Sequence, residues 1–163
     1  GKGADTPRIV HQTGKADHAE VSAAYASLGL EAEVVPFITS MREYYETADL
    51  VICRSGAITV AELTSLGKPA ILIPYPYAVD DHQRANAEIL VHAGAARMVL
   101  DADLTPERMA EEIRSVLMNR DALTVMSHAA LTLGRPEATT AVLWECFACL
   151  PPHVRPAREG VCQ

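Results

Sequence analysis

The sequence is poor in basic residues and long apolar runs, and each shortage removes a class of protein. Lysine and arginine number 14 against 21 aspartates and glutamates in 163 residues, which gives a net charge of −7. A nucleic-acid-binding domain normally carries a basic stripe, and electrostatic docking on an anionic membrane also needs basic residues. No apolar run approaches the roughly 20 residues that span a bilayer. The first residues, GKGADTPRIV, contain no signal-peptide core.

Cysteine and histidine are also too sparse to build a scaffold or a metal site. The four cysteines are too few and too clustered for a disulfide framework. Cys146 and Cys149 form a C-x-x-C pair in a helical pattern, with no second ligand pair and no histidine at zinc spacing. We interpret them as structural thiols rather than a metal or redox site. A reduced, cytoplasmic chain is expected.

The residues that are present indicate one soluble α/β domain. Hydrophobic residues make up 49% of the chain and charged ones 21%. Short apolar runs at 8–11, 33–36, 50–53, 70–73 and 96–100 alternate with helical patterns at 17–28, 40–48, 57–66 and 82–92. The run at 50–53 is unbroken, as in a strand buried on both faces. Three helices follow, at 105–117, 120–133 and 136–150. This order predicts a doubly wound parallel sheet followed by C-terminal helices, with a loose tail at 151–163.

Ligands of such a sheet bind at the carboxyl ends of its strands, where four segments are expected to converge. Residues 54–57 read Arg-Ser-Gly-Ala and open a helix, whose free N–H groups favour an anion. Glu62 is the one acid of that helix, either a solvated side chain or an acceptor for ribose hydroxyls. The other three segments are 11–14, the apolar Phe37-Ile38 and the loop 74–83. In that loop, Asp80 or Asp81 either caps the next helix or belongs to a sugar-recognising turn.

One long pattern combines these segments: VVPFI…M…Y…ADLVICRSGAITVAEL…GKPAILIPYPYAVDDHQRANA. It closely resembles the donor-binding domain of the MurG family of bacterial peptidoglycan glycosyltransferases. The resemblance runs from about residue 9 to 117 and is densest between 34 and 96. It implies a Rossmann-like half of the two-domain GT-B architecture. It also implies an inverting transfer of N-acetylglucosamine from UDP-N-acetylglucosamine to undecaprenyl-pyrophosphoryl-MurNAc-pentapeptide, which converts lipid I to lipid II.

The resemblance also assigns roles to residues. The backbone of Ile38 would meet the uracil, Glu62 the ribose hydroxyls and Gln83 the hydroxyls of the sugar ring. The start of the helix would lie along the phosphates and ribose through Ala57, Ile58, Thr59, Val60 and Ala61. The residues expected behind those that touch the ligand are His11, Gln12, Thr13, Arg54, Ser55 and Gly56.

The chain departs from the family pattern at both ends. We expect the segment 1–150 to be the donor domain without its first strand, because the glycine-rich turn that precedes residue 9 in the family has no counterpart here. The acceptor domain, with its proposed general base, is not matched either, so these residues alone are expected to be inactive. No Asp-x-Asp motif marks a pyrophosphate-bound metal, and no cofactor is implied. The complete protein would lie on the cytoplasmic face of the inner membrane.

Two alternatives stay open. One is a GT-B relative with another UDP-sugar or acceptor, such as a glycolipid synthase or a UDP-sugar epimerase. The other is a nucleotide-binding module without turnover. Catalysis on lipid I would exclude the module, whereas UDP binding fits all three functions.

Overall fold

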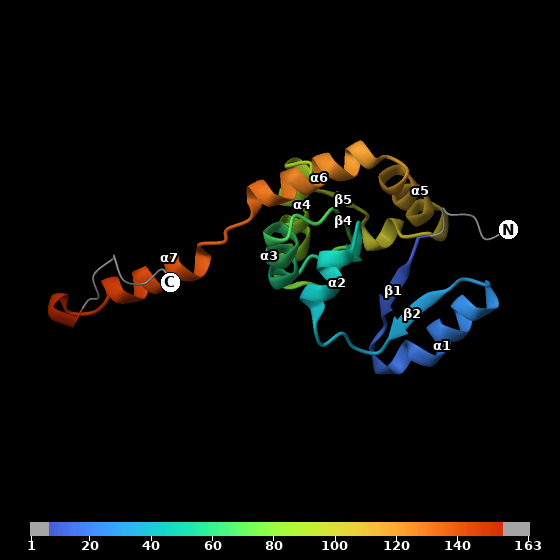
Figure 1. The fold of residues 1–163 in the computed structure, drawn as a ribbon, viewed down its shortest axis with the longest axis horizontal. Helices are drawn as coiled ribbons and strands as arrows, with labels where there is room; N and C mark the ends of the chain where they lie inside the picture. Colours follow the sequence, from blue (N-terminus) through green and yellow to red (C-terminus); the bar gives the residue numbers. More distant parts are fainter. Residues whose placement is uncertain (1–6, 155–163) are drawn as a thin grey trace. The chain divides into compact units, whose positions relative to one another are not determined.

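The strands form two separate parallel ladders in the computed structural model, which describes residues 7–154 (Figure 1). The chain divides into two units, Gly1–Tyr44 and Tyr45–Gln163, and each ladder lies within one of them. The Rossmann-like α/β class predicted from the alternating pattern is confirmed.

The first unit is a β-α-β element. Strand β1 (Ile9–Gln12) leads through α1 (Gly14–Ser27) to β2 (Ala32–Val35), which pairs with β1 in parallel. Gly14 has φ +79°, a left-handed conformation that glycine adopts without steric cost, so the chain turns from strand to helix within two residues. Helix α2 (Met41–Thr47) crosses the boundary into the second unit.

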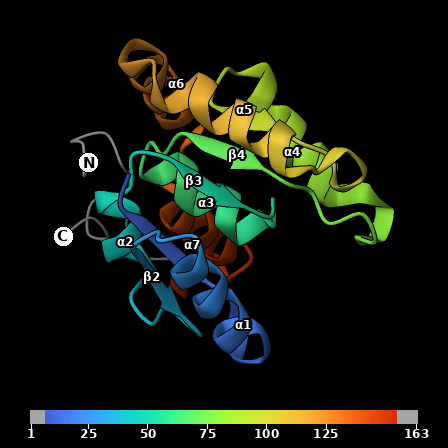
Figure 2. The same cartoon turned by 90° about the vertical axis from the view of Figure 1, so that its right-hand side faces the viewer.

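The second unit is built on a ladder of order β3-β4-β5. Its elements in chain order are β3 (Val51–Cys53), α3 (Ala57–Ser65), β4 (Ala70–Leu72), the 3-10 turn η1 (Val79–Asp81), α4 (His82–His92) and β5 (Ala96–Met98). The turn η2 (Asp101–Asp103), α5 (Pro106–Leu117), α6 (Arg120–Leu133), α7 (Ala138–Ala148) and the turn η3 (Pro152–Val154) follow. Helix α3 packs on both α4 and α6, and α4 packs on β5. Figure 2 shows α3, α4 and α6 from a second direction.

Burial differs sharply between neighbouring strands. Every residue of β4 is buried, because β4 lies between β3 and β5. The expectation that β3 is buried on both faces is wrong, since Ile52 is 43% exposed. Among residues 7–154, β3 pairs with β4 alone, and an edge strand leaves part of its apolar surface uncovered.

A glycine allows the close approach of the chain after α3 to helix α6. Gly67, just past α3, has φ +61°, and a Cβ atom there would lie 2.7 Å from Cγ of Leu131 on α6. Only glycine combines that backbone conformation with such close packing. Helix α5 has a side-chain cap, because Oγ1 of Thr105 accepts from the backbone N–H of Arg108 at 3.1 Å.

The C-terminal helix α7 buries none of its residues. It is shorter than the predicted 136–150, and η3 follows it. The rest of the expected loose tail, residues 155–163, lies outside the described part of the chain. Within residues 7–154, no helix combines the length and the apolar content needed to cross a membrane.

Candidate functional site

The residues singled out from the sequence fall in both units of the structure. His11, Gln12, Thr13 and Ile38 belong to the first unit, and the helix start at 54–62 and Gln83 belong to the second.

In the first unit, Gln12 fixes the loop that follows β2. Its Oε1 accepts from the backbone N–H of Ile38 at 2.9 Å. The N–H of Ile38 is therefore occupied, while its carbonyl accepts no hydrogen bond within residues 7–154. If Ile38 contacts a base, it does so as an acceptor, which suits the N3–H group of uracil.

His11 and Thr13 have protein partners instead. Nδ1 of His11 lies 3.2 Å from the hydroxyl of Tyr25 on α1, and the two rings meet edge to face. Thr13 donates its backbone N–H to the carbonyl of Val35 at 3.0 Å. Both residues connect the end of β1 to its neighbours.

In the second unit, the start of α3 leaves three backbone amides without an acceptor. Gly56 is the N-cap and has no side chain to cap with. The first bond of the helix runs from the N–H of Val60 to the carbonyl of Gly56. The N–H groups of Ala57, Ile58 and Thr59 accordingly have no acceptor among the described residues. Free amides at the positive end of a helix dipole are groups that favour an anion.

Glu62 lies more than one turn into α3 and is half-buried. None of the described residues hydrogen-bonds or ion-pairs with its carboxylate. It lies close enough to Tyr45 to act on that phenol, whose pKa is raised to about 12 by burial first and then by the nearby Cys53 and Glu62. A carboxylate that is partly shielded from water and has no partner is not typical of a solvated helix face. It is more typical of a group that accepts hydrogen bonds from a ligand.

Arg54 braces the ends of three strands. Its Nη1 donates to the carbonyls of Ile73 at 3.2 Å and Pro74 at 3.0 Å, and to Oδ1 of Asp101 at 2.8 Å. Its guanidinium also lies 5.6 Å from the centre of the Tyr75 ring. The ion pair is largely exposed and contributes little energy by itself. The guanidinium of Arg54 is therefore engaged in intramolecular hydrogen bonds, and it supports the loop after β4.

Gln83 has both of its carbonyl groups bonded. Its side-chain Oε1 accepts from the backbone N–H of Tyr75 at 3.0 Å, and its backbone oxygen accepts from Oγ of Ser55 at 2.7 Å. Ser55 is completely buried, and its own carbonyl accepts from Nδ2 of Asn86 at 3.0 Å. The start of α3 and the start of α4 are thereby connected.

Capping of α4 by an aspartate, one of the two interpretations of this loop, is not observed. Asp80 and Asp81 both have φ of 52°, and neither side chain caps the helix. Nδ1 of His82 instead lies 2.6 Å from the carbonyl of Val79. Left-handed backbone is uncommon outside glycine, although aspartate tolerates it better than most residues. The turn before Gln83 is thus held by backbone geometry rather than by a side-chain cap.

The sequence interpretation did not identify Tyr75, Asn86 or Asp101 as parts of this arrangement. Asn86 stands in the HQRANA segment that carried the resemblance, and this was the available signal for it. Nothing local marks Asp101, which meets Arg54 across 47 residues of sequence.

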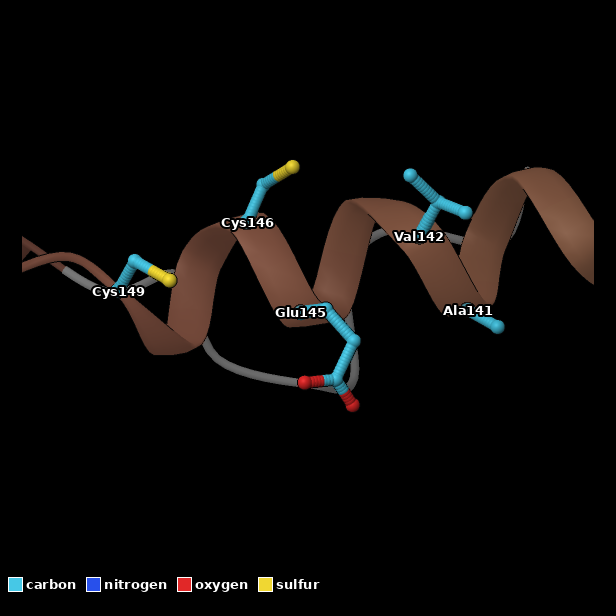
Figure 3. Close-up of a pocket in the computed structure, with 5 residues that line it drawn as sticks. All are labelled: Ala141, Val142, Glu145, Cys146 and Cys149. Carbon is cyan, nitrogen blue, oxygen red and sulfur yellow. The ribbon is translucent and has the colours of Figure 1, made fainter.

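Among the described residues, Cys53 is partly buried, whereas Cys146 and Cys149 are exposed. Burial raises the pKa of the Cys53 thiol to about 12. Cys146 and Cys149 are exposed and line a pocket together with three other residues of α7, with Cys149 lying just past the end of that helix (Figure 3). They are therefore not core thiols. In the part of the chain that the structure describes, no three histidine, cysteine, aspartate or glutamate side chains are placed to hold a metal ion together.

Alkylation of the native chain at pH 8 should distinguish the two groups. A pKa of about 12 leaves roughly one Cys53 thiol in ten thousand ionised at that pH, and only the thiolate reacts. Peptide mass mapping after brief iodoacetamide treatment should find Cys146 and Cys149 modified and Cys53 unmodified. Unfolding in guanidinium should expose Cys53 to the reagent. Equal labelling of Cys53 in the native chain would contradict its buried placement.

The glycosyltransferase family 28 C-terminal domain is the family whose model matches this chain, over residues 3–142. The chain is 47% identical over 143 residues to a protein of Syntrophus aciditrophicus, covering 88% of this chain and 40% of that protein. It is 49% identical over 144 residues to a protein of Hahella chejuensis, with the same coverages. Both relatives are named UDP-N-acetylglucosamine--N-acetylmuramyl-(pentapeptide) pyrophosphoryl-undecaprenol N-acetylglucosamine transferase. The chain thus spans about two fifths of the length of these relatives.

Two solved structures of glycosyltransferases superpose on this chain. The crystal structure of Acinetobacter baumannii MurG superposes with a TM-score of 0.79 and 41% identity, over 85% of this chain and 42% of that one. The glycosyltransferase VinC superposes with a TM-score of 0.62 over 87% of this chain and 35% of that one. At 19% identity, VinC supports the fold alone.

Proposed function

Because this chain belongs to the glycosyltransferase family 28 C-terminal domain family, we propose that it is the donor-binding part of an N-acetylglucosaminyltransferase. The reaction would carry N-acetylglucosamine from UDP-N-acetylglucosamine to undecaprenyl-pyrophosphoryl-MurNAc-pentapeptide. The observation that carries this proposal is the start of α3. Three amides and one carboxylate, that of Glu62, lie on the same short helix without partners among the described residues. The amides suit the diphosphate of a nucleoside diphosphate, and the carboxylate suits its ribose hydroxyls.

Each part of the donor has a matching group on the chain. The diphosphate would accept from the N–H groups of Ala57, Ile58 and Thr59, the ribose would donate to Glu62, and the uracil would donate to the carbonyl of Ile38. Gln83 would bind the sugar. Val60 and Ala61 have their N–H groups inside the helix and would contact the ligand through their surfaces only.

The contribution of this domain to the reaction is stabilisation of the leaving UDP. Negative charge develops on the diphosphate as the glycosidic bond breaks, and fixed N–H dipoles stabilise such charge. The acceptor hydroxyl must also lose a proton to a base. None of the residues that would bind the donor is proposed as this base. We therefore propose that another domain of the complete enzyme supplies the base and binds the acceptor.

The strand pairings within each unit are compatible with a Rossmann-like donor domain. In a doubly wound sheet of order 3-2-1-4-5-6, strands 2 and 3 pair with each other, and strands 4, 5 and 6 pair in succession. The ladders β1-β2 and β3-β4-β5 have these pairings. We propose that residues 1–150 form this domain, and that the complete protein works at the cytoplasmic face of the membrane where its lipid-linked acceptor lies.

A nucleotide-binding module without turnover is the second candidate. The hydrogen bonds that hold Ile38 and Gln83 in place are made by residues of this chain. We therefore expect this chain by itself to bind the donor but not to transfer the sugar. Transfer to lipid I by the complete protein would exclude the module.

The chain should bind UDP more tightly than ADP. The carbonyl of Ile38 can accept from uracil N3–H, and one such bond is worth about 1 kcal/mol, or roughly fivefold in affinity. We expect weak binding of both nucleotides by calorimetry, in the order UDP over ADP, with the sugar of UDP-N-acetylglucosamine adding little in the absence of the acceptor domain.

Inorganic pyrophosphate is the matched control, because it has no base. It should raise the apparent dissociation constants of UDP and ADP by the same factor. ADP binding as tight as UDP binding would remove Ile38 from base recognition. Failure of all three ligands to bind would contradict the anion site at α3.

A further inference from the structure

We propose that Ser55 and Asn86 are positioning residues that orient Gln83 for the sugar of the donor. This inference rests on the proposed function, because it assumes that Gln83 faces the sugar. It adds two residues and a mechanism of orientation to that function.

The two residues form a reciprocal clamp between two helix starts. Ser55 precedes the N-cap of α3, and its Oγ donates to the backbone oxygen of Gln83 at 2.7 Å. Asn86, in the first turns of α4, donates from Nδ2 to the carbonyl of Ser55 at 3.0 Å. One bond runs from α3 to α4 and the other runs back. The backbone of Gln83 is therefore fixed relative to the phosphate-binding amides of α3.

The burial of Ser55 makes the clamp hard to replace. Its side chain is completely shielded from solvent, so water cannot substitute for its bond to Gln83. A serine also places its hydroxyl on a short side chain, where few orientations are available. Loss of the Asn86 bond leaves the buried carbonyl of Ser55 without a donor among the described residues.

The bond from Tyr75 then determines which end of the Gln83 amide faces the ligand. A backbone N–H can only donate, so the atom it meets must be Oε1 rather than Nε2. Nε2 has no acceptor among residues 7–154. Gln83 consequently presents two N–H donors, which match oxygen atoms of a hexose ring.

The test uses the complete enzyme with two donors that differ only at one hydroxyl, UDP-N-acetylglucosamine and its 4-epimer UDP-N-acetylgalactosamine. Asn86→Ala and Ser55→Ala should each lower the ratio of kcat/KM between these donors at least fivefold. Inhibition by UDP should stay within twofold. This ratio is independent of the fraction of enzyme that is folded, so simple destabilisation does not change it.

Two comparisons sharpen the result. Combined with Gln83→Ala, Asn86→Ala should cause no further loss of the donor ratio, because both act through one side chain. Arg84→Ala is the matched control, since Arg84 lies on the same turn but pairs only with the exposed Glu88. It should leave the ratio unchanged.

Hydrogen exchange on the present chain gives a readout that is independent of catalysis. The N–H of Tyr75 is protected by Oε1 of Gln83, so Asn86→Ala should speed its exchange several-fold, while Arg84→Ala should not. An unchanged donor ratio, or unchanged Tyr75 exchange, in both Asn86→Ala and Ser55→Ala would overturn the clamp and leave the proposed function intact. A complete wild-type enzyme that does not use UDP-N-acetylglucosamine would overturn both.

Discussion

Replacing Glu62 with alanine in the complete enzyme is expected to weaken binding of UDP-N-acetylglucosamine by about 1.5–3 kcal/mol, the usual value of hydrogen bonds to a charged group. The carboxylate is half-buried and has no partner among residues 7–154, so it is available to both ribose hydroxyls. Glu62→Gln should retain part of the affinity, because one carbonyl can still accept. Calorimetric titration of the donor measures both changes.

A ligand without ribose hydroxyls is the control for this prediction. Binding of 2′,3′-dideoxy-UDP should be nearly the same in wild type and Glu62→Ala, since the bonds in question are absent from both complexes. The free energy of unfolding should also change little, because no intramolecular bond is lost. If neither substitution alters donor affinity, Glu62 is a surface residue and the ribose assignment is wrong.

Gln83→Ala is expected to reduce use of UDP-N-acetylglucosamine strongly, by roughly a hundredfold in kcat/KM, while UDP inhibits almost as before. A site that hydrogen-bonds a hydroxyl discriminates well, because a mismatched ligand leaves its polar groups unpaired. The preference over UDP-N-acetylgalactosamine should narrow at the same time. Steady-state kinetics with both donors, beside UDP inhibition, provide the measurement.

Gln83→Glu separates the two functions of the amide. The carboxylate keeps an acceptor for the N–H of Tyr75 but offers the sugar no donor, so its donor use should fall between wild type and Gln83→Ala. An unchanged ratio between the two sugars, or an equal loss of UDP affinity, would leave Gln83 as a residue of the helix start alone.

Local pattern predicted most of the secondary structure. The bounds of α4 and α6 agree with the sequence prediction, and the other helices and strands differ from it by a few residues. These elements are fixed by periodic apolar residues and by local punctuation such as Thr105-Pro106, which act over a few positions. The family pattern likewise located the α3 turn, Glu62 and Gln83 directly, because the pattern is itself a string of neighbouring residues.

What the sequence by itself determined is therefore the order of strands and helices and the α/β class, and it also predicted the segment that we propose carries the ligand-binding groups. The tertiary structure decided which of those polar groups have hydrogen-bond partners among the described residues and which do not. It placed Ile52 on an open edge, turned Asp80 and Asp81 away from capping, committed Arg54 to Asp101, and fixed Gln83 through Ser55 and Asn86. These outcomes depend mainly on contacts between residues 28 to 47 positions apart. Such contacts arise only when strands and helices pack, so no local pattern records them.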